Sequence, residues 1–167
     1  MGMRRRAREK ALQFLYQHDM NPPESLVDSL DHFFESQRLA ALAEVADPSN
    51  PMPDPPPPPT SDDAALRLFA ERLIRGVLEN QNALDAEIQK HAHNWDLRRM
   101  AAVDRNILRL AAYEMRFRTD IPPVVSINEA VEIAKRFSTP ESGKFVNGIL
   151  DRIKGDLLRP LRSGVES

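Results

Sequence analysis

The segment over residues 102–116, AVDRNILRLAAYEMR, carries the strongest structural signal in the chain. Its apolar side chains recur at helical spacing but lie on more than one side of the predicted helix: Val103, Ile107, Leu108, Leu110, Ala111 and Met115. A helix that is apolar over most of its circumference is usually surrounded by other elements. We therefore predict that this helix lies at the centre of the fold.

The segments on both sides also repeat their apolar residues with a period near 3.6, and none alternates as a strand would. Before the central helix, this pattern predicts helices over about 4–18, 24–45 and 82–91. It also predicts a helix that begins near residue 61, with Ser61 or Asp62 as its N-cap. Trp95 and Leu97 lie in a connector. After the central helix, the box Ser126–Glu129 is expected to open a sixth helix, and Thr139-Pro140 a seventh. The sequence thus predicts an all-α protein.

Length and composition narrow the class of protein. A chain of 167 residues has the size of one domain, and we expect 1–167 to form a single domain. The absence of cysteine excludes disulfides and thiol chemistry. No apolar run approaches the roughly 18–20 residues that span a bilayer, and no apolar stretch of a signal peptide follows the Arg-rich start. We expect a cytoplasmic protein without a membrane segment.

The composition changes sharply over residues 47–63, where eight of seventeen residues are proline. Proline cannot donate the backbone hydrogen bonds of a helix, so this stretch predicts an extended surface loop between the second and third helices. A ligand for an SH3-like partner is conceivable, but a tolerated surface insertion is favoured.

No catalytic motif is found: there is no P-loop, no G-x-S-x-G, no dinucleotide fingerprint and no H-E-x-x-H. His91 and His93 are two residues apart and would lie on different sides of a helix, which makes them a poor metal pair. We therefore expect neither an enzyme nor a metal or other cofactor.

Two segments nevertheless suggest a binding function. The first is the cluster Arg4, Arg5, Arg6 and Arg8, because guanidinium groups stay charged and bind phosphate oxygens in bidentate fashion. A solvated basic terminus explains the cluster equally well. The second is the stretch 144–148, KFVNG, at the start of the last helix.

In that stretch Phe145 could stack on an unpaired base, Lys144 could meet a phosphate, and Asn147 could bond a base edge. A lone aromatic beside an apolar stripe more often completes the core, so the structural role is favoured for Phe145 on its own. Together with the basic arm, the combination favours single-stranded RNA.

These segments resemble one known family. The resemblance begins with RRRARE at 4–9, ALQ at 11–13 and LY at 15–16, and continues with DRNILRL at 104–110 and AYE at 112–114. It is most specific in INEAVEIAK at 127–135 and KFVNGILD at 144–151. The order and spacing of these blocks are similar to those of the NusB family and frame nearly the whole chain.

The resemblance implies a single NusB-like domain of about seven helices in two small packed bundles. It also implies a transcription antitermination factor that binds boxA RNA of ribosomal RNA operons together with NusE, a small-subunit ribosomal protein, and promotes processive transcription by RNA polymerase. By position, Arg4, Arg5, Arg6 and Arg8 would hold RNA phosphates. Lys144, Phe145 and Asn147 would contribute from the last helix, Glu141 would tune affinity by its charge, and Tyr16 and Asp104 would lie near the partner.

The chain departs from the family pattern in three places: the Pro-rich loop is additional, Glu141 replaces an expected aspartate, and Gly143 replaces a bulkier polar residue. Two other functions stay open. One is the NusB-like RNA-binding domain of an RNA cytosine methyltransferase, although at this length we expect no catalytic domain beside it. The other is a helical adaptor that binds only proteins. Homodimerisation is compatible with the family, but the sequence does not determine it.

Overall fold

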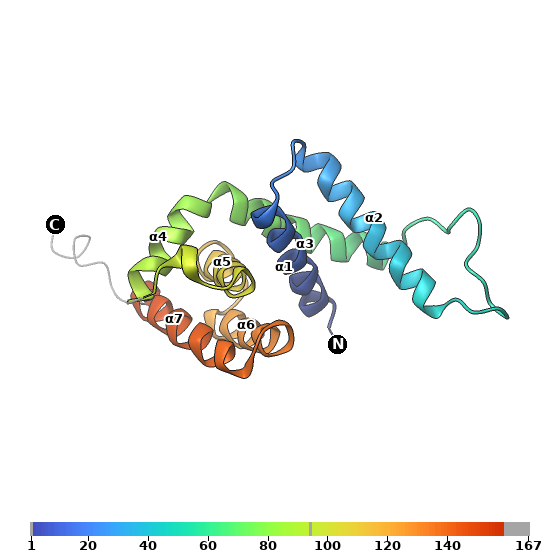
Figure 1. Cartoon of the computed structure of the whole chain (residues 1–167). Coiled ribbons are helices and arrows are strands. Elements are labelled where there is room, and N and C mark those ends of the chain that lie inside the picture. The colour runs from blue at the N-terminus through green and yellow to red at the C-terminus, as the bar shows by residue number, and fades with distance from the viewer. Residues whose placement is uncertain (1, 94, 159–167) are drawn as a thin grey trace. The chain divides into compact units, whose positions relative to one another are not determined.

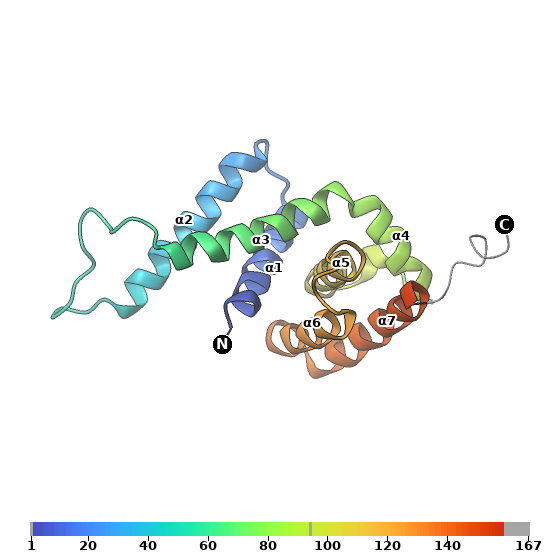
Figure 2. The same ribbon diagram turned by 180° about the vertical axis from the view of Figure 1, so that it is seen from behind.

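The computed structural model describes residues 2–93 and 95–158, and these form seven α-helices and one 3-10 turn without a β-strand (Figures 1 and 2). The elements are α1 (Met3–Met20), α2 (Leu26–Val45), α3 (Ser61–Glu79), α4 (Gln81–His91), η1 (Leu97–Arg99), α5 (Ala102–Phe117), α6 (Pro123–Phe137) and α7 (Pro140–Leu158). The all-α prediction is confirmed. The chain divides into two compact units, Met1–Arg72 and Leu73–Ser167, whose border lies within α3.

In the first unit, aromatic residues join α1 to α2. The ring of Phe14 meets that of Phe33 edge to face, with centroids 5.4 Å apart. Arg67 of α3 binds Asp31 of α2 at 2.5 Å, and its guanidinium carbon lies 5.2 Å from the centroid of the Phe34 ring. The face predicted to be apolar in the first helix is buried as expected: Ala7, Ala11, Phe14 and Leu15.

In the second unit, α5 packs against α4, α6 and α7, and ten of its sixteen residues are buried. This confirms the predicted central helix. Several of these buried residues are polar, and they hold neighbouring helices: the carboxylate of Glu114, for example, accepts a hydrogen bond of 2.9 Å from the Ser126 hydroxyl of α6. The centre of the unit is therefore an apolar core crossed by specific polar contacts.

Two predicted helix starts were wrong. Helix α6 begins at Pro123, because proline fits the first helical position, and the expected cap Ser126 is buried inside the helix. Helix α3 is capped by Thr60, whose hydroxyl accepts a hydrogen bond of 3.1 Å from the Asp63 N–H. In return, the Asp63 carboxylate accepts a hydrogen bond of 2.8 Å from the Thr60 N–H. The predicted cap of α7 is confirmed, since Thr139 Oγ1 accepts the N–H of Ser142 at 3.1 Å.

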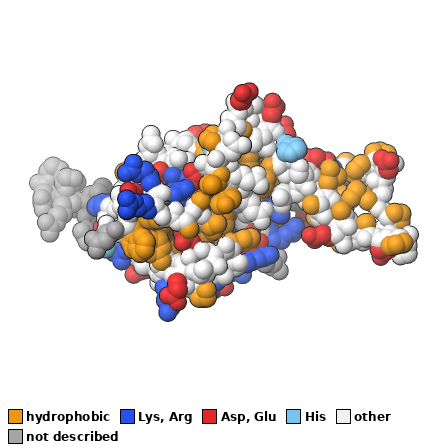
Figure 3. All heavy atoms as spheres, in the orientation of Figure 1, with side chains coloured by type: hydrophobic (Ala, Val, Ile, Leu, Met, Phe, Trp, Pro, Cys, Tyr) orange, Lys and Arg blue, Asp and Glu red, His pale blue; other side chains and the backbone are white. Residues whose placement is uncertain are grey.

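The Pro-rich segment is non-helical from residue 46 to residue 60 and connects α2 to α3. Figure 3 shows its apolar side chains at the surface together with carboxylates. One side-chain contact attaches the loop to α2: Arg38 Nη1 donates a 2.6 Å hydrogen bond to the carbonyl of Pro57. Among the described residues, no helix has both the length and the apolarity needed to cross a membrane.

Candidate nucleic-acid interface

The structure divides the predicted arginine cluster of α1. Arg4 and Arg6 are exposed and Arg5 is half-buried, but Arg8 is only 4% exposed. The guanidinium carbons of Arg4 and Arg8 lie 5.0 and 5.6 Å from the centroid of the Phe69 ring of α3. Cation–π contacts of this kind hold α1 against α3. Arg8 is thus placed to support the fold, whereas Arg4 and Arg6 present charge to solvent.

The beginning of α1 is also favourable for an anion. The cap residue Gly2 offers no side-chain hydrogen bond, and the first turn contains no acidic residue. Backbone N–H groups at a helix start carry a partial positive charge, so cations there are unfavourable by about 0.3–1 kcal/mol each and a bound anion is favourable. The exposed Arg4 and Arg6 add to this field. The end of α1 therefore suits a phosphate group.

The second predicted segment lies on α7. Lys144 and Asn147 are exposed and Phe145 is half-buried, while Val146, Ile149 and Leu150 are buried in the core. The helical period separates these two faces. Phe145 is therefore a boundary residue that contacts the core with one part of its ring and leaves another part accessible.

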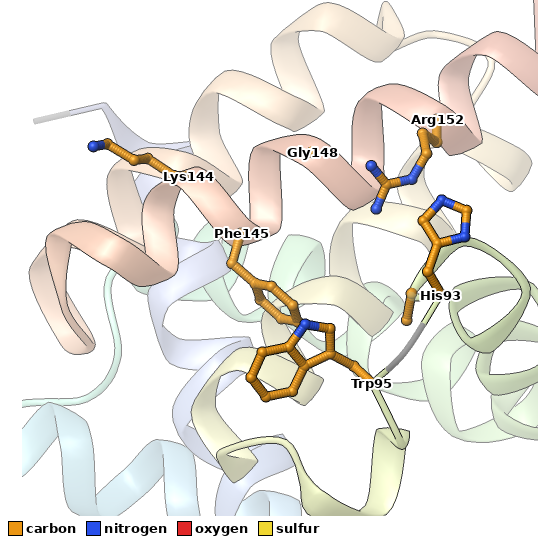
Figure 4. A pocket seen from close by; sticks show the side chains of 7 residues that line it. His93, Trp95, Lys144, Phe145, Gly148 and Arg152 are labelled. Carbon is orange, nitrogen blue, oxygen red and sulfur yellow. The ribbon is translucent and has the colours of Figure 1, made fainter.

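Phe145 packs against a residue that the sequence did not mark as part of the site. The ring of Trp95, in the connector after α4, meets the Phe145 ring edge to face with centroids 5.4 Å apart and an interplanar angle of 70° (Figure 4). Trp95 is 57% exposed. A tryptophan in a connector between helices was the available signal, but its pairing with a residue of α7 depends on the tertiary fold.

A concavity of about 280 Å³ lies beside these two rings. Its lining comes from the end of α4, the connector and α7: Ala92, His93, Trp95, Lys144, Phe145, Gly148 and Arg152. In Figure 4 the rings of Trp95 and Phe145 lie together, and the Lys144 side chain extends away from them. Aromatic rings with flanking cations are the side chains that bind unpaired nucleotides.

The remaining predicted residues fall into different settings. Glu141 is exposed in the first turn of α7, and Tyr16 is 39% exposed on α1. Asp104 is buried in the first turn of α5, where its Oδ2 accepts a 3.1 Å hydrogen bond from the Ser142 hydroxyl of α7. Asp104 therefore contributes to the position of the start of α7. Among the described residues, no group of three or more metal-ligating side chains is placed to hold an ion.

The predicted site residues thus form two groups, one in each compact unit. Arg4, Arg5, Arg6, Arg8 and Tyr16 belong to the first unit, and Asp104, Glu141, Lys144, Phe145 and Asn147 belong to the second.

Comparison with known proteins identifies the family of the chain. The model of the NusB family matches residues 5–154. The chain belongs to the NusB family. The transcription antitermination protein NusB of Myxococcus xanthus (strain DK1622) is 41% identical over 160 residues, which are 96% of this chain and 100% of that protein. NusB of Bacillus subtilis (strain 168), also a transcription antitermination protein, is 44% identical and aligns over 92% of this chain and 96% of its own length.

Solved structures agree with the fold. NusB of T. maritima is 38% identical and superposes with a TM-score of 0.66 over 98% of this chain and 97% of its own. A complex described as the antitermination factors NusB and NusE with double-stranded RNA includes a chain that is 23% identical, with a TM-score of 0.69 over 93% of this chain and 98% of its own. At that identity the likeness shows the fold alone. The resemblance seen in the sequence is confirmed.

Proposed function

We propose that this NusB-family chain is a transcription antitermination factor that binds boxA RNA of ribosomal RNA operons together with NusE. The observation that carries the proposal is the alignment, over 96–100% of their own length, with two relatives that are antitermination proteins. The choice of partners follows from membership of the NusB family, whose model matches residues 5–154. The protein would act in the cytoplasm with RNA polymerase and would catalyse no reaction.

The exposed charges give each group a role in this function. Arg4, Arg5 and Arg6 would hold phosphate oxygens at the start of α1, where the helix end itself attracts anions. Lys144 would contact a further phosphate, and Asn147 a base edge, since both are exposed on α7. Arg8, being buried, would act mainly by holding α1 against Phe69.

The other assigned residues would tune binding or contact the partner. Glu141 is exposed in the first turn of α7, where its negative charge would weaken the attraction of nearby cations for phosphate. Tyr16 offers an exposed ring on α1 to a protein partner. Asp104 accepts a hydrogen bond from the Ser142 hydroxyl. It would therefore act by positioning Ser142 rather than by direct contact with the partner.

The test is fluorescence anisotropy with a labelled boxA-like RNA and a scrambled RNA of equal length, each with and without NusE. We expect tighter binding of the boxA-like RNA, enhanced by NusE and weakened by salt. Absence of RNA binding even with NusE present would overturn the proposal and leave the protein-binding adaptor. Methyl transfer to RNA from a labelled donor would instead support the methyltransferase alternative.

A further inference from the structure

The concavity between the end of α4 and α7 is small, and two aromatic rings and two cations are among the seven residues that line it. Its volume of about 280 Å³ falls just below the range of about 300–1,000 Å³ that holds drug-sized ligands. Aromatic rings of Trp95 and Phe145 form one part of the lining, and the cations Lys144 and Arg152 border another. Among the described residues that line it there is no carboxylate. This combination fits one planar ring attached to an anion.

We propose that this concavity binds a single unpaired nucleotide of the RNA, with its base stacked on Trp95 against the edge of Phe145. Arg152 and Lys144 contact the phosphates on either side of that nucleotide. The assignment rests on the proposed RNA-binding function and adds Trp95, Gly148 and Arg152 to its site. The edge-to-face arrangement of the two rings leaves the indole 57% exposed for stacking.

The connector holds Trp95 in place before any ligand arrives. Gln89 of α4 bonds the backbone at two points: its Nε2 donates to the Trp95 carbonyl at 2.5 Å, and its Oε1 accepts a hydrogen bond from the Leu97 N–H at 2.8 Å. The backbone N–H of Trp95 in turn donates to the carbonyl of Ala92 at 3.1 Å. An exposed indole gains little from hydrophobic burial, so a backbone fixed in this way points to a binding role.

Gly148 leaves space in the same concavity. Phe145, Gly148 and Arg152 follow one another at intervals of three and four residues and so lie on one face of α7 (Figure 4). A Cβ at Gly148 would meet only Arg152 Nη1, at 3.7 Å, so packing does not require a glycine there. Glycine inside a helix is unfavourable relative to alanine. Its presence is explained if a ligand occupies the space of the missing side chain.

The guanidinium group of Arg152 is fixed beside the concavity. Its Nε and Nη2 donate to the carbonyl of His91 at 3.0 and 2.8 Å, at the end of α4. Arg152 lines the concavity, and its Nη1 is the atom that would lie nearest to a Cβ at Gly148. A guanidinium that two bonds already orient loses little freedom when it binds a phosphate. Lys144, exposed two helical turns earlier, supplies a second positive charge.

Trp95 is the single tryptophan of the sequence, so its fluorescence reports on this site alone. The experiment titrates unlabelled boxA-like single-stranded RNA into the full chain while tryptophan emission is recorded, in parallel with anisotropy of the labelled RNA. We expect emission to be quenched with the same midpoint as the anisotropy change, because a stacked base quenches the indole.

Three variants extend the test. Trp95→Ala and Phe145→Ala should each weaken RNA binding about 5- to 150-fold, the range for losing one stacked base. Gly148→Leu fills the concavity and should weaken binding while thermal stability is kept. Phe117→Ala is the matched control, because Phe117 is an exposed aromatic of the same unit that does not line the concavity. Its affinity for RNA should be unchanged.

The outcomes separate this inference from the function on which it rests. RNA binding by anisotropy with unchanged Trp95 emission, and with unchanged affinity of Trp95→Ala and Gly148→Leu, would overturn the nucleotide site and leave the proposed function standing. Absence of any RNA binding would overturn both. The titration of the unmodified protein decides the matter even if Phe145→Ala fails to fold.

Discussion

Arg109 of α5 and Asp85 of α4 form a bidentate ion pair inside the second unit. Arg109 Nε lies 2.7 Å from Asp85 Oδ1, and Arg109 Nη2 lies 2.9 Å from Oδ2. Arg109 is 5% exposed, and its Nη1 donates a further bond of 3.2 Å to Asn106 Oδ1. The pair fixes α4 against the central helix. Because the end of α4 lines the proposed nucleotide site, this contact also supports that site.

Asp85→Ala should lower the free energy of unfolding by about 3 kcal/mol, since it removes the Asp85 carboxylate from a buried guanidinium. Urea denaturation followed by circular dichroism measures the loss. Glu132→Ala is the control, because Glu132 and Lys135 form an exposed pair with 3.6 Å between their charged atoms, worth about 0–1 kcal/mol. Equal effects of the two substitutions would show that the buried pair adds nothing to stability.

Gly76→Ala should destabilise the protein by about 1–3 kcal/mol, the usual cost of overpacking a core. A Cβ at this buried position of α3 would overlap the ring of Tyr113, which is itself stacked on Phe117 with centroids 5.2 Å apart. Thermal unfolding measures the change. In contrast, Gly155→Ala on α7 meets nothing within 4 Å and should stabilise the helix by about 0.5–1 kcal/mol. A stabilising Gly76→Ala would contradict the close approach.

Arg6→Glu should weaken RNA binding for all sequences and reduce the slope of log K against log salt by about 0.7, the value for one phosphate contact on a single strand. The measurement is anisotropy at several salt concentrations. Arg72→Glu makes the same charge change at an exposed position of α3 and is expected to affect the slope less. If both variants lower affinity equally, the effect comes from net charge rather than from a contact at the start of α1.

Stability should fall in mild acid because of His18. Its burial beside Phe14 lowers its pKa below the ordinary value of 6.5, although Asp19 opposes the shift. The unfolded chain then takes up the proton at a higher pH than the folded protein. The contribution of His18 to the free energy of unfolding is therefore complete above pH 6.5. It is lost as the pH falls through the lower pKa that His18 has in the folded protein.

Urea midpoints between about pH 5 and pH 8 test this dependence. His18→Gln should make the decline shallower, because it removes the group that takes up the proton. An identical decline in His18→Gln and the unmodified protein would assign the acid sensitivity to other groups.

The sequence by itself determined the helices and the central position of α5. Apolar residues at helical spacing and prolines at the breaks act within a few residues, so their effect does not depend on the rest of the fold. Thr139-Pro140 specified the start of α7 for the same reason. The blocks INEAVEIAK and KFVNGILD were specific enough to indicate the family, which the family model then confirmed.

The tertiary structure decided which of the marked residues face solvent and which residues meet. Arg8 belongs to a cluster that looks uniformly exposed in the sequence, but it is buried beside Phe69. The Ser126 hydroxyl donates a hydrogen bond to the Glu114 carboxylate of α5 instead of capping α6. Trp95 meets Phe145, far away in the chain. Such contacts depend on how helices pack across the core, and no local pattern of spacing or hydrogen bonding encodes that packing.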